Sequence, residues 1–296
     1  MQRGRHKYLL YISLVFLVFA VYKANYLQMP AIRSLPNLML AFVFLFGGFV
    51  LTAISQQRLL KNASYAVSNG RAVAAVGLNI FGKYIPGKLW VVAGKALYLA
   101  EKEAYPVAEL SVLFMRAQIL ALWCGLVLGI VGLFLNNSLQ MVGLAGLLAL
   151  IIITVVTFSE RAHDAALRVI EKVFKKKIDL PMLKFRQTLG LIPWFMGSWL
   201  CWGVGFFLLA ISISDRMYPF SAIFCFPLAA TLGIIILFAP GGLGIREGII
   251  VGYLALLEIA LPEAITLSAV SRLWFLIGEL FIFLAGYISD KGKYRG

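Results

Sequence analysis

Apolar stretches of about twenty residues recur along the whole chain, and they constrain the fold more than any other feature. A helix needs about 20 residues to cross the hydrocarbon core of a bilayer, which is about 30 Å thick. A membrane β-barrel would instead alternate polar and apolar residues in segments of about ten, a pattern that this sequence does not have. Only 14% of the 296 residues are charged, against about a quarter in soluble domains. We therefore expect an all-α polytopic membrane protein.

Six stretches are predicted to cross the membrane completely. They cover about residues 8–27, 37–55, 109–135, 139–158, 189–213 and 265–289. Two further apolar segments, residues 64–100 and 220–260, are each interrupted by a Pro-Gly pair, which leaves arms too short to cross. We predict that each of these segments forms a re-entrant helical hairpin. The side on which the chain ends fall does not separate this topology from one with seven or eight spans.

Basic residues are concentrated at three places, and the net charge of the chain is +14. They are Arg3, Arg5 and Lys7, then residues 159–188, then Lys291, Lys293 and Arg295. Basic residues beside short spans mark the cytoplasmic side, so both termini and residues 159–188 are predicted to be cytoplasmic. Residues 159–188 have the spacing of a basic amphipathic surface helix, and a solvated linker is the alternative. No recognition motif accompanies the charge, so nucleic acid is not an expected partner.

The two Pro-Gly pairs, which begin at Pro86 and Pro240, are 154 positions apart. A shift by this number places the fifth span on the second, the second hairpin on the first, and the last span on the third. In the predicted topology these partners run in opposite directions, as in the inverted repeats of many transporters. We therefore predict a single transmembrane domain, residues 1–296, with halves 1–158 and 189–296 and one hairpin tip entering from each face.

The first break carries charge inside apolar sequence. Pro86 suits the first turn of a helix, so the helix that follows Gly87 would point its free N–H groups at the hairpin tip. Lys83 and Lys88 lie beside this helix start, and Asn79 could add hydrogen bonds. A helix N-terminus with two lysines suits a phosphate group at membrane depth. The alternative is a surface turn whose lysines extend to the lipid headgroups.

The second break has a similar composition. It contains one proline and three glycines, Pro240, Gly241, Gly242 and Gly244. These glycines permit positive φ and a close approach of the backbone to a ligand. Arg246 and Glu247 then open a helix. Glu247 suits capping in the first turn, whereas Arg246 gains nothing there and needs an anionic partner from the protein or from a ligand.

The last span contains two charged residues, Arg272 and Glu279. They are seven positions apart and therefore share one helix face. Ionisable groups in such surroundings usually face the interior of the bundle. They either form a structural clamp or join Arg246 and Glu247 in a polar cavity, and Arg116 is a candidate counterpart of Arg272 in the first half. The cysteines and histidines have no metal-ligand spacing, so we expect neither a metal nor a cofactor.

In these segments the chain resembles the lysylphosphatidylglycerol synthase transmembrane family. The resemblance is carried by Lys-Tyr-Ile-Pro-Gly-Lys-Leu-Trp at 83–90, Pro-Gly-Gly-Leu-Gly-Ile-Arg-Glu at 240–247 and the segment 272–279, and it covers about residues 10–288. It implies a flippase-like, lipid-handling domain in the inner (plasma) membrane. By motif match, the implied headgroup-binding positions are Asn79, Lys83, Pro86, Gly87, Lys88, Pro240, Gly241, Gly242, Gly244, Arg246, Glu247, Arg272 and Glu279.

The expected function is translocation of an anionic phospholipid or a polyprenyl-phosphate-linked lipid, without catalytic chemistry. The chain stops at Gly296, so we expect no aminoacyltransferase domain and no lysyl transfer. The alternative function is that of an accessory membrane subunit in a glycosyltransferase pathway, because some members of the family occur beside glycosyltransferases. A glycosyltransferase or an aminoacyltransferase would then be the protein partner. A third function, an ion-coupled carrier of a soluble anion, also remains open.

Overall fold

The computed structural model describes most of the chain, and every regular element in the described residues is helical. The described residues are 30–85, 90–136, 140–161, 164, 165, 168, 171, 185–235, 242 and 244–291. The all-α class predicted from the sequence is therefore confirmed for this part of the chain. The predicted span at residues 8–27 lies outside the described residues, as does most of the predicted linker at 159–188.

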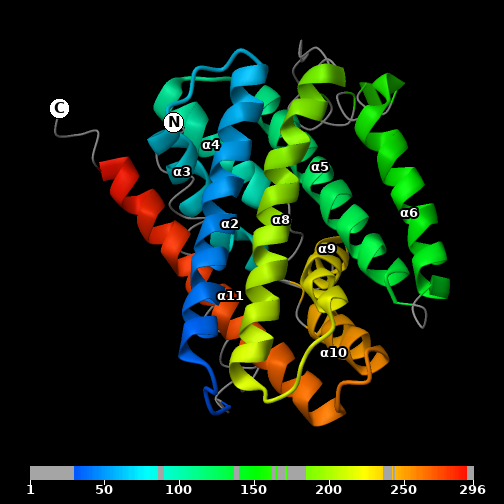
Figure 1. The fold of residues 1–296 in the computed structure, drawn as a ribbon. Helices are drawn as coiled ribbons and strands as arrows, with labels where there is room; N and C mark the ends of the chain where they lie inside the picture. Colours follow the sequence, from blue (N-terminus) through cyan, green and yellow to red (C-terminus); the bar gives the residue numbers. More distant parts are fainter. Residues whose placement is uncertain are drawn as a thin grey trace.

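Within the described residues, four helices are long and apolar enough to cross a membrane (Figure 1). They are α2 (Leu35–Asn62), α5 (Val107–Phe134), α8 (Phe185–Ile213) and α11 (Leu261–Lys291). Each has 28 to 31 residues and is therefore about 42–46 Å long, which exceeds a hydrocarbon core of about 30 Å. A further apolar helix, α6 (Gln140–Phe158), packs against α5. These helices lie on five of the six predicted spans.

Two pairs of shorter helices lie between the long ones. The first pair is α3 (Asn69–Gly77) and α4 (Trp90–Glu103), with the 3-10 helix η1 (Ile80–Tyr84) between them. The second pair is α9 (Cys225–Ile235), which follows the 3-10 helix η3 (Phe220–Phe224), and α10 (Ile245–Leu256). The four α-helices have 9 to 14 residues, and none could cross about 30 Å alone. They occupy the segments predicted as hairpins, and their re-entry into the membrane stays a prediction.

The order of helices in the second half repeats the order in the first. Helices α2, α3, α4 and α5 are followed later in the chain by α8, α9, α10 and α11. Helix α4 begins at Trp90 and α10 at Ile245, 155 positions later, while α5 begins at Val107 and α11 at Leu261, 154 positions later. The helix boundaries therefore keep the spacing of the two Pro-Gly pairs.

Helices α2 and α8 form the antiparallel centre of the bundle (Figure 1). At one end the Arg33 N–H donates to the Ser212 carbonyl over 2.8 Å, and at the other the Asn62 amide donates to the Gln187 carbonyl over 3.3 Å. Midway, the Trp202 ring lies directly on Gly48, where a Cβ would come within 2.3 Å of the indole nitrogen. Only glycine at position 48 lets the two helices approach so closely.

One short helix of each pair packs against a long helix of the other half. Helix α3 lies against α11, and a Cβ on Gly77 would be 2.1 Å from the Ile282 carbonyl oxygen. Helix α9 lies against α5, where a Cβ on Gly129 would be 2.7 Å from the Leu228 side chain. The two halves are thus interlocked through contacts that depend on the absence of a side chain.

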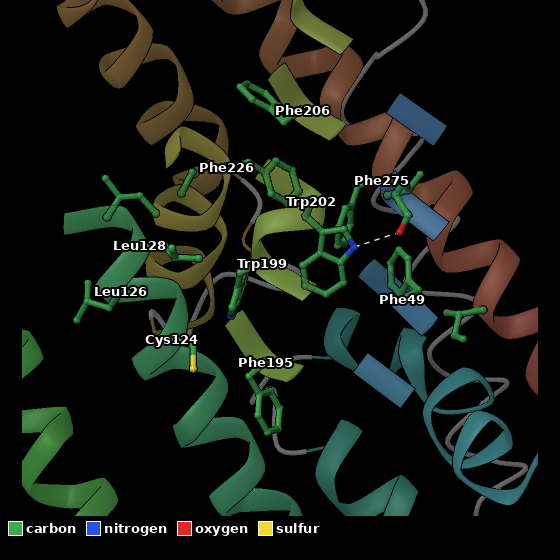
Figure 2. Packing of buried hydrophobic residues seen from close by; sticks show 14 of the residues in the cluster. Phe49, Cys124, Leu126, Leu128, Phe195, Trp199, Trp202, Phe206, Phe226 and Phe275 are labelled. Atoms are coloured by element: carbon green, nitrogen blue, oxygen red, sulfur yellow. Dashed lines mark hydrogen bonds between the residues drawn. The ribbon is translucent and has the colours of Figure 1, made fainter. Parts of the chain in front are cut away.

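An aromatic cluster fills the core between α2, α8, α9 and α11 (Figure 2). The Trp202 ring meets the rings of Phe49 and Phe275 at centroid distances of 5.2 and 5.3 Å. Phe226 extends the cluster from α9, 5.2 Å from Phe275. Phe275 joins this cluster to the charged part of α11, because it lies between Arg272 and Glu279 on that helix.

Candidate functional site

Described residues beside the two chain breaks meet at the middle of α11, around Arg272 and Glu279. Both residues are buried, with 6% and 1% of their surface exposed. Helix η1 brings two side chains to them, and the start of α10 brings two more. We call this group the central charge cluster; it comprises Lys83, Tyr84, Arg246, Glu247, Arg272 and Glu279.

Glu279 is held by the first break. One carboxylate oxygen forms an ion pair with the Lys83 ammonium, and the other accepts a hydrogen bond from the Tyr84 hydroxyl over 2.9 Å. The Lys83 ammonium also lies 5.0 Å from the centre of the Phe275 ring. Two consecutive residues of η1 therefore attach the first break to α11.

Arg272 is held by the second break and also contacts the first. Its Nη1 lies 3.6 Å from Oε1 of Glu247, and its guanidinium carbon lies 5.4 Å from the centre of the Tyr84 ring. Arg272 and Glu279 therefore share a buried helix face but bind different breaks. From the sequence, Arg272 and Glu279 were expected either to form a structural clamp or to join Arg246 and Glu247 in one polar site. The contacts place both residues in one cluster with Arg246 and Glu247.

Glu247 has two roles at the start of α10. Its Oε2 accepts a hydrogen bond from the Gly244 N–H over 2.7 Å, which caps the helix, while its Oε1 faces Arg272. Gly244 and Gly242 have φ angles of 80° and 74°, a conformation that residues with a side chain rarely adopt. The prediction that these glycines serve positive φ is confirmed.

Arg246 is the cation of the cluster with the least polar compensation. It is 5% exposed, and its guanidinium carbon lies 4.5 Å from the centre of the Phe226 ring and 5.0 Å from that of Phe275. Figure 2 shows these two rings side by side in the core. Its one hydrogen bond to another described residue is a long one, 3.4 Å, to the Ser271 carbonyl, and its Nε has no partner there. Ring faces attract a desolvated cation but do not neutralise it.

The charges of the cluster do not balance. Lys83, Arg246 and Arg272 face two carboxylates, Glu247 and Glu279. Among the described residues, one positive charge is therefore left over in a buried place, where an uncompensated charge is strongly disfavoured. An anion delivered by a ligand would restore the balance.

Asn79 lies apart from these contacts. Its side-chain NH2 group donates to the Ala75 carbonyl over 2.9 Å. Its side-chain oxygen lies so close to Gly94 that a Cβ there would be only 2.3 Å away. Asn79 therefore packs α3 against α4, and a role in headgroup binding stays a prediction. The other predicted positions, Pro86, Gly87, Lys88, Pro240 and Gly241, lie outside the described residues.

Two phenylalanines of the site are not among the predicted positions. Phe275 follows Arg272 by three residues and precedes Glu279 by four, a spacing that puts all three on one face of a helix and could have identified it. Phe226 carries no such signal, because it reaches Arg246 from another helix. Arg116, the proposed counterpart of Arg272, lies on α5 with its Nη1 unpaired among the described residues, and no contact places it in the central charge cluster.

A second polar network ties the end of α11 to the first pair of short helices. Asp290 accepts hydrogen bonds from the Arg71 guanidinium over 2.8 Å and from the Tyr98 hydroxyl over 2.7 Å. Its carboxylate also lies 3.2 Å from the Lys102 ammonium, and Arg71 pairs with Glu103 at 3.0 Å. In this network two cations meet two carboxylates, so it needs no ligand to balance its charge.

Metal chemistry finds no support in the described ranges, where no three His, Cys, Asp or Glu side chains converge as ligands. Comparison with protein families gives one match. The family model described as "Lysylphosphatidylglycerol synthase TM region" matches residues 8–286, which is nearly the whole chain. No curated protein matches the chain.

Proposed function

The chain belongs to the lysylphosphatidylglycerol synthase transmembrane family, and from this premise we propose that it is a lipid translocator of the flippase type. Its cargo is an anionic phospholipid or a polyprenyl-phosphate-linked lipid. The protein binds the phosphate of the headgroup in the central charge cluster while the lipid tails stay in the bilayer. No bond of the lipid is made or broken.

One observation carries the proposal: the cluster where the two breaks meet has one more cation than carboxylates, and all of it is attached to a single helix. Arg246 is the residue to which a phosphate adds most, because it is buried and forms no ion pair within the described residues. A guanidinium offers paired N–H donors in a planar geometry that matches phosphate oxygens. The start of α10 adds free backbone N–H groups, which favour an anion.

The short helices support a way to move the headgroup. We propose that α3–α4 and α9–α10 are re-entrant hairpins, one from each side of the membrane, so that the helix starts at Trp90 and Ile245 both lie at depth. The repeated helix order and the antiparallel α2–α8 pair fit an inverted repeat. In such folds, one repeat rocks against the other around a fixed central site. The basic segments would keep both termini cytoplasmic in the inner membrane.

A reconstitution assay tests the proposal. The purified protein is placed in liposomes that contain fluorescent phosphatidylglycerol, and the fraction of label that becomes accessible to an external quencher is followed over time. We expect flipping by the wild type and loss of most of it in the Arg246→Ala, Arg272→Ala double variant. Arg33→Ala is the matched control, because Arg33 pairs with Asp215 at the surface, where both side chains are more than half exposed. A fluorescent isoprenyl phosphate and a phosphatidylcholine form parallel arms.

The accessory role is favoured by a different feature of the same cluster. Lys83 and Arg272 already pair with protein carboxylates, as they would in a cluster that only holds the breaks together. A wild type that flips none of the three lipids would refute the translocator and favour the accessory subunit. Equal flipping of phosphatidylglycerol by the wild type and the double variant would refute the proposed role of the arginines.

A further inference from the structure

Lys95 is a buried cation that lies outside the central charge cluster. It belongs to α4, and 5% of its surface is exposed. Its ammonium donates to the side-chain oxygen of Gln56, on α2, over 3.4 Å, which is long for a hydrogen bond. The ammonium also lies 4.8 Å from the centre of the Phe114 ring, on α5. Both contacts are with uncharged groups of neighbouring helices.

The described residues supply no carboxylate to Lys95. No charged group among them acts on its ammonium at close range. The one acidic side chain outside the described residues is Asp179, which belongs to the predicted cytoplasmic segment 159–188 and closely follows three lysines at 175–177. An amide oxygen and a ring face attract an ammonium but do not neutralise it. In the part of the chain that the structure describes, Lys95 is therefore a positive charge without an anion.

The packing of the short helices does not explain a lysine at this position. The matching positions of α10, 154 and 155 residues later, are Ile249 and Ile250. The second pair of short helices therefore packs with an apolar side chain where the first pair has Lys95. Buried charges are usually paired or bind a ligand, and an ionisable residue at membrane depth usually marks the path of a substrate or an ion. An anionic ligand would supply the missing charge.

Lys95 lies near a segment of the central charge cluster. Gly82, which precedes Lys83, packs closely on the start of α4, where a Cβ on Gly82 would be 3.1 Å from the Val91 nitrogen. Lys95 follows Val91 by four residues, which is about one helical turn or about 6 Å along the axis. Helix η1, which carries Lys83, therefore touches α4 about one turn before Lys95.

Lys95 also lies toward the end of α2 that is predicted to be cytoplasmic. Its partner Gln56 follows Phe49 by seven residues, or about 10 Å along α2. The Phe49 ring meets that of Phe275, beside the cluster, at a centroid distance of 5.2 Å. Beyond Gln56, the last turn of α2 carries Lys61, and basic residues mark the cytoplasmic side. This order places Lys95 between the central charge cluster and the inner surface.

We propose that Lys95 is the centre of a second anion site, which binds a phosphate oxygen between α2, α4 and α5. The ligand is the phosphate of the lipid headgroup on the inner side of the central charge cluster. The inference therefore rests on the proposed function, because this site would hold the headgroup before or after it occupies the cluster. The ammonium and the phosphate keep their charges, and no covalent bond is made or broken. A free phosphate ion presents the same oxygens, so the test includes both sources.

The groups around the ammonium suit a transient phosphate contact. An ammonium offers three donors on a flexible stem, and a charge-assisted hydrogen bond is about twice as strong as a neutral one. The Gln56 side chain carries two N–H donors beside its oxygen, so rotation of its amide turns a donor toward a bound phosphate. One cation binds a phosphate less firmly than the arginines of the cluster, as a position on a route requires.

Binding of an anion to two variants separates the second site from the cluster. The whole chain is purified in detergent, and the binding of dihexanoyl phosphatidylglycerol is measured by titration calorimetry at constant pH, with inorganic phosphate in a parallel arm. Arg246→Met removes the least compensated cation of the cluster and should still bind phosphatidylglycerol. Addition of Lys95→Met should weaken that remaining binding about tenfold or more, through loss of a charge-assisted hydrogen bond. Lys61→Met in the same background is the matched control, because Lys61 is exposed on α2, and the affinity should change by less than about twofold.

The Tm without ligand separates a binding role from a structural one. Replacement of an uncompensated buried charge by an apolar chain of similar volume is often neutral or stabilising. Lys95→Met should therefore leave the Tm unchanged or raise it. A lower Tm with unaltered affinity for phosphatidylglycerol would assign Lys95 to packing with Gln56 and Phe114 and overturn the site. Lys95→Gln, which is polar and uncharged, is the second variant with the same expected loss of binding.

The outcomes distinguish this inference from the proposed function. Equal binding of both anions by Arg246→Met with and without Lys95→Met overturns the second site and leaves the translocator standing. Binding of inorganic phosphate that depends on Lys95, without binding of phosphatidylglycerol there, supports the anion site and makes a soluble ion its ligand. A wild type that binds neither phosphatidylglycerol nor a short isoprenyl phosphate overturns the proposed function itself.

Discussion

Removal of one partner of the Lys83–Glu279 pair should destabilise the protein unequally. Lys83→Met leaves Glu279 almost fully buried with only the Tyr84 hydroxyl as a partner. Breaking a buried pair in this way costs about 3–5 kcal/mol. Glu279→Gln leaves Lys83, whose side chain is 26% exposed and so less buried than that of Glu279, and its cost should be only about 1–2 kcal/mol. The double variant leaves neither member of this pair unpaired, and a glutamine can still bond Tyr84.

Thermal unfolding in detergent, followed by tryptophan fluorescence, measures these differences. A cost of about 3–5 kcal/mol corresponds to a fall in Tm on the order of 10 °C for a chain of this size. The double variant, Lys83→Met with Glu279→Gln, should recover most of that loss. Equal losses for the two single variants would refute the reasoning.

Two further predictions concern the interlocked packing of α3 and α11. Gly77→Ala forces a Cβ to within 2.1 Å of the Ile282 carbonyl oxygen, so it should lower the free energy of unfolding by about 1–3 kcal/mol. In the control Gly190→Ala the new Cβ meets nothing within 4 Å, so the Tm should not fall in the same assay. Asp290→Asn removes the carboxylate that binds Arg71 at 2.8 Å and should lower stability by about 1–3 kcal/mol. Salt screens buried charge pairs less than exposed ones, so added salt should reduce the stability difference between wild type and Asp290→Asn only slightly. Loss of this difference at high salt would contradict the buried position of the network.

Hydropathy was enough to predict the class of protein and most of its long helices. Five of the six predicted spans coincide with the helices α2, α5, α6, α8 and α11. The spacing of the Pro-Gly pairs, 154 positions, also recurs between the starts of α5 and α11. These features are local: a helix needs a fixed number of apolar residues to cross a bilayer, and a break in that run is visible in any single sequence.

Periodicity predicted which residues would be buried but not what they would contact. The seven-residue spacing put Arg272 and Glu279 on one interior face, and both are buried there. Nothing in the sequence indicated that Glu279 binds Lys83 while Arg272 binds Glu247, or that Asn79 is used within its own hairpin. The spacing of residues along a helix predicts which side of that helix a side chain lies on. It does not predict the contact partner, because the partner belongs to another helix.

The tertiary structure decided that two breaks 154 positions apart in the chain share one site. That result depends on the exchange of short helices between the halves, which sets α3 against α11 and α9 against α5. The exchange depends in turn on a few close contacts, such as Gly77 against Ile282 and Gly129 against Leu228. The sequence by itself determined that the breaks carry charge within apolar sequence. Which charges meet was decided by three-dimensional packing, because an ion pair requires two side chains to lie within a few ångströms, and only the mutual position and rotation of the helices brings them there.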